Sequence, residues 1–313
     1  MRFVLPVLLA SVCFGTTGTA QALGPDADAT SIGAARILIG GGALALVALL
    51  VDFAGRRGGA IGTSAASAPG VASGNGMATW LIVLIGSAGV LAYQPAFFAG
   101  TAANGVAVGT VVALGSAPVI TGGLDWLLRR RYPGGRWLVA TVVATAGVAL
   151  LAAATDPGGT ASDPLGLLAS LGAGAAYAVY TLAAKSLLDR GLTPTGSMGA
   201  LFGTAAVGSI PLLLATDASW LATGAGLAMA LWLGLVATTL AYVLFGLGLG
   251  GLAPATVSTL TLAEPLTAAV LGVALLGETL SAGAVSGLVV LATGIVVLAT
   301  GSVRRATAQP LPA

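Results

Sequence analysis

Two ionisable side chains stand inside long apolar stretches of the sequence, where a charge is costly. Arg36 lies early in the apolar run 30–51, and Glu264 lies near the middle of the run 254–276, directly before Pro265. A charged side chain at the centre of a bilayer costs about 2.5–3.5 kcal/mol on insertion scales, so we interpret both as functional candidates. A carboxylate can bind an amine or a proton and a guanidinium can bind a carboxylate, so the two together would suit a zwitterion such as an amino acid.

Both residues also have a structural interpretation, which the sequence leaves open. Glu264 can form a hydrogen bond or an ion pair between helices, with Arg36 as one partner, and Arg36 can reach back to the outer membrane interface. Pro265 and Pro118 are predicted to bend or gate their helices, because a proline inside a helix removes a backbone hydrogen bond.

Polar-tipped side chains within other apolar runs are the next candidates for lining a cavity. Gln94 is the strongest of them, because an amide buried in lipid needs hydrogen-bond partners. Packing with a satisfied hydrogen bond is the alternative for every one of these side chains. The predicted substrate-binding set is Glu264, Arg36, Gln94, Tyr93, Tyr177 and Trp232, and two further residues of the same character are Tyr180 and Tyr242.

Other kinds of chemistry find little support in the composition. The chain has no histidine and a single cysteine, Cys13, which removes the commonest metal ligand, the usual general base and any internal disulfide. The sequence also lacks the glycine-rich phosphate-binding pattern of an ATP-driven machine. We therefore predict no catalytic residue, no metal site and no cofactor. If the candidate residues bind a solute, they would serve its transport. The alternative is a membrane-embedded enzyme or a non-transporting membrane scaffold.

These residues belong to a chain that needs lipid as its solvent. Of its 313 residues, 57% are hydrophobic and 7% are charged, whereas a soluble domain carries about 25% charged residues. A helix of about 20 apolar residues crosses the hydrocarbon core of a bilayer. Ten runs have this length, so we predict an all-α integral membrane protein with spans at 3–20, 30–51, 78–98, 103–126, 136–154, 164–186, 196–215, 224–248, 254–276 and 281–301.

The charged residues sort to the two sides of this predicted arrangement. If the amino terminus is cytoplasmic, every Lys and Arg except Arg36 falls in a cytoplasmic segment. Such one-sided placement follows the positive-inside rule and predicts that both termini are cytoplasmic. A net charge of +2 is too small to indicate nucleic-acid binding. The tryptophans near predicted interfaces are expected to anchor the chain in the membrane, and they are Trp80, Trp126, Trp137 and Trp220.

The two halves of the sequence resemble each other. A shift of 147 residues aligns 104–152 with 251–299 without a gap, so that Pro118 meets Pro265 and Gly147 meets Gly294. A shift of 159 matches the leucine-rich start of each half. Each half then holds five spans, an odd number, so the second half enters the membrane from the opposite side, as in transporters with inverted repeats.

We predict three parts on this basis. Residues 1–155 form the first repeat, with a flexible cytoplasmic linker at about 53–77, residues 160–303 form the second repeat, and 304–313 form a short cytoplasmic tail. Residues 1–22 also fit a cleavable signal peptide. The match of the first span to the sixth favours a retained helix.

Several segments resemble the EamA type of the drug/metabolite transporter superfamily. They are FGTTGTA (14–20), Arg36 early in the second span, AYQPAFF (92–98), 109–118, and LAEPL (262–266) continuing through LGETL (276–280). The resemblance extends over about residues 5–301. It implies ten helices in two inverted units in a bacterial inner membrane, and a secondary transporter that exports amino acids or other small metabolites by alternating access. Its partners would be a small-molecule substrate and the lipid bilayer. Substrate identity, transport direction, energy coupling and homo-oligomerisation stay open.

Overall fold

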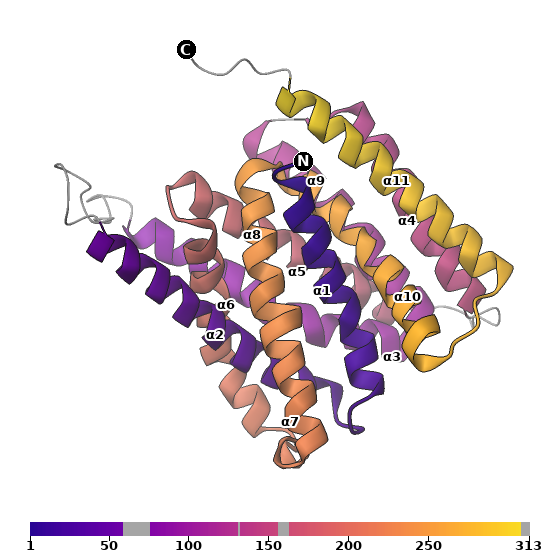
Figure 1. Cartoon of the computed structure of the whole chain (residues 1–313), viewed down its shortest axis with the longest axis horizontal. Coiled ribbons are helices and arrows are strands. Elements are labelled where there is room, and N and C mark those ends of the chain that lie inside the picture. Colours follow the sequence, from indigo (N-terminus) through magenta and orange to yellow (C-terminus); the bar gives the residue numbers. More distant parts are fainter. Residues whose placement is uncertain (59–75, 131, 156–162, 308–313) are drawn as a thin grey trace.

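The architecture is all-helical over the residues described in this computed structural model, which are 1–58, 76–130, 132–155 and 163–307 (Figure 1). Ten segments in this part of the chain are long and apolar enough to cross a membrane, from Val4–Ala22 to Ala282–Gly301. Each of the ten predicted runs coincides with one of them to within a few residues, except that the third span ends later than predicted, at Gly105, and the fourth begins later, at Val108. The prediction of a ten-helix membrane protein is confirmed.

The first five spans form four helical elements, one of which contains two spans. They are α1 (Val4–Ala22), α2 (Ala29–Gly58), α3 (Gly76–Arg129) and α4 (Gly135–Thr155). Two spans lie within α3, because the helix turns sharply at Gly105, whose φ of 79° is a left-handed conformation that favours glycine. The predicted linker overlaps α2, which continues to Gly58, and its residues 59–75 lie outside the described part.

The second five spans are more broken. They comprise α5 (Pro164–Asp189), α6 (Pro194–Leu214), the 3-10 turn η1 (Ser219–Ala222), α7 (Gly224–Leu231), the π-helical segment η2 (Trp232–Leu240), α8 (Ala241–Gly251), α9 (Pro254–Leu260), the 3-10 turn η3 (Thr261–Ala263), α10 (Glu264–Leu276) and α11 (Ala282–Thr307). The eighth span is therefore α7, η2 and α8 in series, and the ninth is α9, η3 and α10. Helix α11 continues into the segment predicted as a tail, and 308–313 lie outside the described residues.

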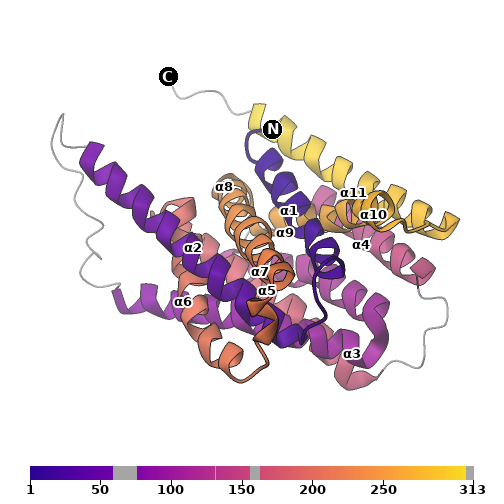
Figure 2. The same cartoon turned by 60° about the horizontal axis from the view of Figure 1, so that its bottom comes forward.

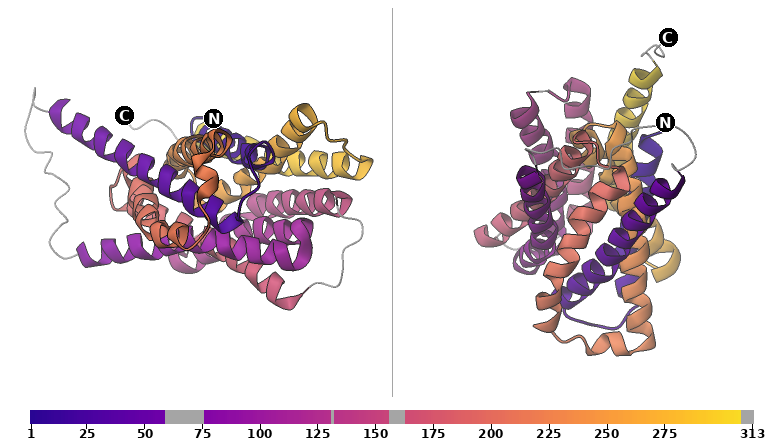
Figure 3. Two further views of the ribbon diagram at one scale, coloured as in Figure 1. Left: turned by 90° about the horizontal axis from the view of Figure 1, so that it is seen from below. Right: turned by 90° about the vertical axis from the view of Figure 1, so that its left-hand side faces the viewer.

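The helices pack in pairs across the bundle. α2 packs on α6 at one side and α4 packs on α11 at the other, with α1, α3, α5 and α8 between them (Figures 1 and 2). α3 packs along α5, whereas α1 packs against α8 and α10. Views from below and from the side show the same arrangement (Figure 3).

Small residues let α4 and α11 approach closely. A Cβ added at Gly294 would lie 2.6 Å from the backbone N of Ala144, and one added at Gly147 would collide with the backbone of Leu291. Such close contact through glycines is a common way for helices to associate in lipid, where no hydrophobic force drives them together. Gly147 and Gly294 are equivalent under the 147-residue shift, and each meets the backbone of the other helix.

Basic residues stand at the ends of α3 and α5 and at the start of α4, and they are Arg129, Lys185, Arg190 and Arg136. Arg136 donates to the Val297 carbonyl of α11 at 2.8 Å, toward the end of the bundle where the chain begins and α11 ends (Figure 1). We call this the basic end. Arg129 pairs with Asp125 at 2.9 Å and also with Asp189, and Lys185 lies 3.7 Å from Asp189. The Lys185 ammonium also donates to the Leu249 carbonyl at 3.1 Å.

Two of the four predicted membrane anchors are wrong. Trp80 and Trp126 are exposed, as anchors should be, but Trp137 and Trp220 are buried. The indole N–H of Trp137 donates to the Ala255 carbonyl at 2.9 Å. The indole N–H of Trp220 donates to the Ser31 hydroxyl at 2.9 Å. These indoles tie helices together inside the bundle, because a buried N–H needs an acceptor.

Candidate functional site

A small cavity lies among the helices of the bundle interior. Its volume is about 70 Å³. α1, α2, α3, α5, α8, α9, η3 and α10 all contribute to its wall, so both halves of the chain line it. The lining residues are Phe14, Arg36, Tyr93, Leu114, Ala117, Tyr177, Tyr180, Tyr242, Ser258, Thr261, Leu262 and Glu264. Four of the six predicted substrate-binding residues, Arg36, Glu264, Tyr93 and Tyr177, therefore meet at one site.

Glu264 lines the cavity directly after a 3-10 turn within the ninth span. α9 ends at Leu260, the 3-10 turn η3 follows, and Glu264 and Pro265 form the first residues of α10. A proline is well tolerated at this position, since its missing N–H would have no helical partner there. The helix dipole at the start of α10 favours an anion. Within the described part of the chain, the carboxylate has no hydrogen-bond or ion-pair partner.

Arg36 approaches the cavity from α2 and is held by the π-helical segment. Its Nε donates to the Thr238 hydroxyl at 2.9 Å, and its Nη2 donates to the Ala237 carbonyl at 2.8 Å. These contacts lie inside the bundle rather than at the outer interface. Among the described residues, no ion pair within 4.0 Å joins Arg36 to Glu264. Two guanidinium nitrogens are thus engaged by protein, and the rest of its donors are left for another acceptor.

Aromatic rings form much of the remaining wall. The Tyr177 hydroxyl lies 3.0 Å from the Thr261 hydroxyl, and the Tyr180 hydroxyl lies 3.1 Å from that of Tyr242. The rings of Tyr177 and Tyr180 are 5.0 Å apart, and those of Phe14 and Tyr242 are 5.1 Å apart. These contacts hold the rings in place, and the ring faces and hydroxyl tips offer both apolar and polar surface.

Gln94 lies at a different place. It lines a separate pocket of about 20 Å³ together with Gly33 and Ser209, between α2, α3 and α6. Its Oε1 is buried and has no hydrogen-bond partner among the described residues. A Cβ at Gly33 would collide with this oxygen, so glycine is what allows the amide to pack there. In this conformation Gln94 does not contact the central cavity.

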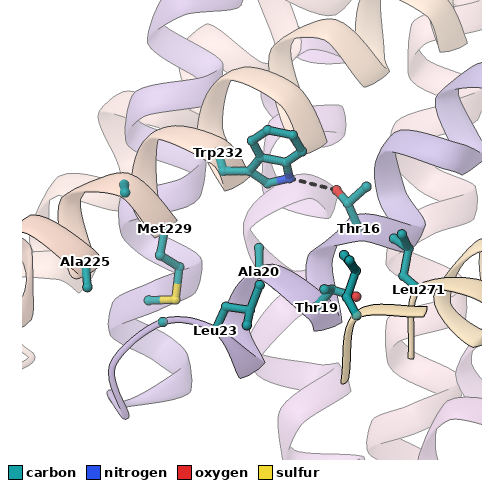
Figure 4. Close-up of a pocket in the computed structure, with 11 residues that line it drawn as sticks. Thr16, Thr19, Ala20, Leu23, Ala225, Met229, Trp232 and Leu271 are labelled. Carbon is teal, nitrogen blue, oxygen red and sulfur yellow. Dashed lines mark hydrogen bonds between the residues drawn. The ribbon is translucent and has the colours of Figure 1, made fainter. Parts of the chain in front are cut away.

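Trp232 also lies outside the cavity, on a larger apolar pocket of about 490 Å³ between α1, α7 and α10. Figure 4 shows its indole pointing toward Thr16 of α1, to whose hydroxyl the N–H donates at 3.0 Å. Thr16 follows the exposed Leu9 and Val12 along one side of α1. Phe14, two residues away, points to nearly the opposite side, since each helical residue turns by about 100°. The apolar pocket therefore faces outward, and the central cavity lies behind α1.

The two prolines differ in their surroundings. Pro265 stands at the interruption of the ninth span, whereas Pro118 lies within α3, whose non-helical backbone angles occur at Gly105 instead. Ala117, beside Pro118, lines the same cavity as Glu264. Positions 117 and 264 are equivalent under the 147-residue shift, as are Leu114 and Thr261, which also line it.

Asp28 and Asp217 lie at the other end of the bundle, where α1 joins α2 and α6 joins α7 (Figure 1). Asp28 accepts from the Ser31 N–H at 2.9 Å, and the Ser31 hydroxyl donates to the Asp217 carbonyl oxygen at 2.9 Å. The backbone N–H of Ser219 donates to the Asp217 carboxylate at 2.8 Å and holds the pKa of that group below its usual value. No group of three or more metal-ligating side chains is found among the residues the structure describes.

Sequence reasoning missed the π-helical segment and the residues it presents. Thr238 carries no signal of its own in an apolar run, because threonines are common in such runs and usually bond to their own helix. Tyr180 and Tyr242 are among the polar-tipped candidates but not in the predicted substrate-binding set, and both line the cavity.

A family profile and a curated relative indicate the class of protein. A profile of the EamA-like transporter family matches residues 164–300. "Uncharacterized transporter YwfM" of Bacillus subtilis (strain 168) is 38% identical over 92% of this chain and 90% of its own length. "Uncharacterized protein PA1977" of Pseudomonas aeruginosa is 32% identical over 63% of this chain and 66% of its own length. A solved crystal structure matches with a TM-score of 0.75 at 18% identity, over 96% of this chain and 97% of that one, which shows a shared fold.

Proposed function

This chain belongs to the EamA-like transporter family, and we propose that it exports a small zwitterionic metabolite, such as an amino acid, by alternating access. It is a multi-pass membrane protein and a transporter of a small molecule. The observation that carries the proposal is that Arg36 and Glu264 line the same cavity without being paired to each other. An ammonium group would bind Glu264, and a carboxylate would bind the free donors of Arg36.

Alternating access rests on the two halves being related by a two-fold axis. Under the proposed repeats, α2 corresponds to α6 and α4 to α11, and each pair packs together. The packing of α1 on the eighth span corresponds to that of α5 on α3. The matched cavity positions 114/261 and 117/264 support the same axis. Two near-equivalent halves can exchange conformations, so a site between them opens to each side in turn.

The orientation of the protein in the membrane follows from the charged ends of the bundle. We propose that the basic end, with Arg129 and Lys185, is cytoplasmic in a bacterial inner membrane, since positive charge is retained inside. Both termini then face the cytoplasm. The acidic end, with Asp28 and Asp217, faces outward. The membrane-enzyme alternative gains no specific observation, because Glu264 is the one carboxylate that lines the cavity among the described residues.

Reconstituted protein tests the proposal. Counterflow in proteoliposomes is measured with each common amino acid and with simple amines. Glu264→Gln and Arg36→Gln remove one charge each, and Glu278→Gln is the control, because that carboxylate is exposed beyond the end of α10.

We expect each cavity substitution to raise the half-saturation concentration roughly 10- to 140-fold, since a hydrogen bond to a charged group contributes about 1.5–3 kcal/mol. Glu278→Gln should leave flux unchanged. Equal flux in the wild type and both cavity variants would remove the proposed site. Counterflow of amines but not of amino acids would replace the zwitterion by a cation.

A further inference from the structure

We propose that the π-helical register of η2 is a cradle that orients Arg36, and that Thr238 is the positioning residue through which the transporter selects solutes with a carboxylate. The proposal rests on the proposed function and names how its cavity recognises one end of the solute. Thr238 does not line the cavity and acts through Arg36.

The π register makes an acceptor available that an α-helix would use itself. In an α-helix the N–H of Ala241 would bond to the carbonyl of Ala237. Here it is directed at the Val236 carbonyl, five residues back, and at that of Thr238. The Ala237 carbonyl thereby loses its α-helical donor, and the Arg36 Nη2 donates to it at 2.8 Å. π-helical turns are rare in proteins, and those that do occur are often found at functional sites.

The Thr238 side chain fixes the second contact. Its hydroxyl donates to the Leu233 carbonyl at 2.9 Å, which also lies five residues back. The hydroxyl oxygen therefore directs a lone pair away from its own helix, and the Arg36 Nε donates to it at 2.9 Å. Thr238 is fully buried, so neither water nor lipid competes for this bond.

The partner helix is fitted to the same segment. A Cβ at Gly40 of α2 would lie 2.6 Å from the Gly234 carbonyl oxygen and 2.6 Å from the Thr238 Cβ. The neighbouring Thr239 hydroxyl donates to the Gly40 carbonyl at 2.9 Å. α2 and η2 therefore pack closely at Gly40, which lies one helical turn after Arg36 on α2.

Two fixed bonds on one edge determine where the guanidinium points. The group is planar and its five N–H donors have a rigid geometry, so holding Nε and Nη2 leaves the Nη1 edge to serve the cavity that Arg36 lines. A lysine at this position would have one rotatable ammonium and could not be oriented in this way. The cradle would therefore make carboxylate recognition directional.

A melting cycle tests the cradle without any substrate. Thr238→Val removes the hydroxyl at nearly constant volume, and Thr238→Ser retains it. Thr239→Val is the matched control, because it removes a π-segment hydroxyl that bonds α2 but not Arg36. We expect the melting temperature of the Thr238→Val/Arg36→Gln double variant to differ from the sum of the two single-variant shifts, because both substitutions remove the same contact. The shifts of Thr239→Val and Arg36→Gln should add in their double variant. Additive shifts for the first pair would overturn the cradle.

A selectivity measurement tests the positioning role. Competition by L-alanine and by L-alaninamide, which lacks the carboxylate, is compared in proteoliposomes. We expect Thr238→Val to lower the apparent affinity for L-alanine roughly 2- to 12-fold, which is the effect of losing one net hydrogen bond. The apparent affinity for L-alaninamide should be unchanged. Thr238→Ser should restore the discrimination and Thr239→Val should keep it. An unchanged ratio in Thr238→Val would overturn the positioning role. Absence of wild-type flux would count against the proposed function, while the melting cycle still decides the cradle.

Discussion

The contact between α4 and α11 gives a prediction in which two opposing effects can be weighed. Gly294→Ala adds one methyl group to α11. That carbon would lie 2.6 Å from the Ala144 N and 2.8 Å from the Ala140 carbonyl oxygen, whereas non-bonded carbon atoms pack at about 3.5–4.0 Å. Both obstacles are backbone atoms of α4, so neither can rotate away, and the two helices must separate.

The cost of the collision should exceed the gain in helix propensity. Overpacking a tight contact costs about 1–3 kcal/mol, and replacing glycine by alanine within a helix gains about 1 kcal/mol. Because the clash is with backbone, we take the upper part of the first range, which leaves a net loss of about 1–2 kcal/mol. At about 2–4 °C per kcal/mol, the melting temperature should fall by about 2–8 °C.

The measurement is thermal unfolding of purified protein, followed by tryptophan fluorescence. Gly42→Ala is the control, because a Cβ there meets nothing within 4 Å, so its melting temperature should be unchanged or slightly raised. Gly147→Ala should behave like Gly294→Ala, since it meets the backbone of Leu291. A Gly294→Ala protein that melts at or above the wild type would refute the reasoning.

Two further predictions concern burial and orientation. Trp137→Phe loses the hydrogen bonds to Ala255 and Thr259 and should cost about 1–3 kcal/mol of stability, whereas Trp126→Phe, at an exposed position, should be nearly neutral; equal melting of the two variants would contradict the assigned roles. In a Cys13→Ala background, a membrane-impermeant maleimide added to intact cells should label Asp26→Cys and leave Arg190→Cys unlabelled, and the reverse pattern would invert the proposed orientation.

The spans could be predicted from the sequence because lipid imposes a simple constraint. A helix must satisfy its backbone internally and remain apolar for about 20 residues, and both conditions are visible residue by residue. The interruptions inside spans are less visible. Pro265 marks the break of the ninth span, but Pro118 stands in continuous helix, so proline alone does not locate a break. The π register at Trp232–Leu240 lies within a continuous apolar run, and no residue type in that run marks it.

The candidate site was partly predictable for the same reason. A charge inside a span attracts notice by its cost, so Arg36 and Glu264 could be found. Gln94 and Trp232 have the same polar-tipped character as Tyr93, yet they point into other pockets, because the face of a helix that meets the cavity depends on how the helices are arranged. Trp137 illustrates the same limit, since its place near a predicted interface gave no sign that α9 would cover it.

The cavity combines a symmetric frame with an asymmetric lining, and each has a separate consequence under the proposed mechanism. Positions 114 and 117 on α3 line the same cavity as positions 261 and 264, and the repeat makes them equivalent, yet one half of the chain offers Leu114 and Ala117 while the other offers Thr261 and Glu264. Equivalent frames allow the two halves to exchange shape at little cost in free energy. Unequal linings give a bound solute one preferred orientation, with its ammonium toward α10 and its carboxylate toward α2. Ala117→Glu would add a second carboxylate to the wall of the same small cavity, and two like charges in one cavity disfavour each other. We therefore expect this variant to lose zwitterion transport even though the frame is unchanged, and counterflow in proteoliposomes, with Ala117→Gln as the uncharged control, would show whether the asymmetry is required.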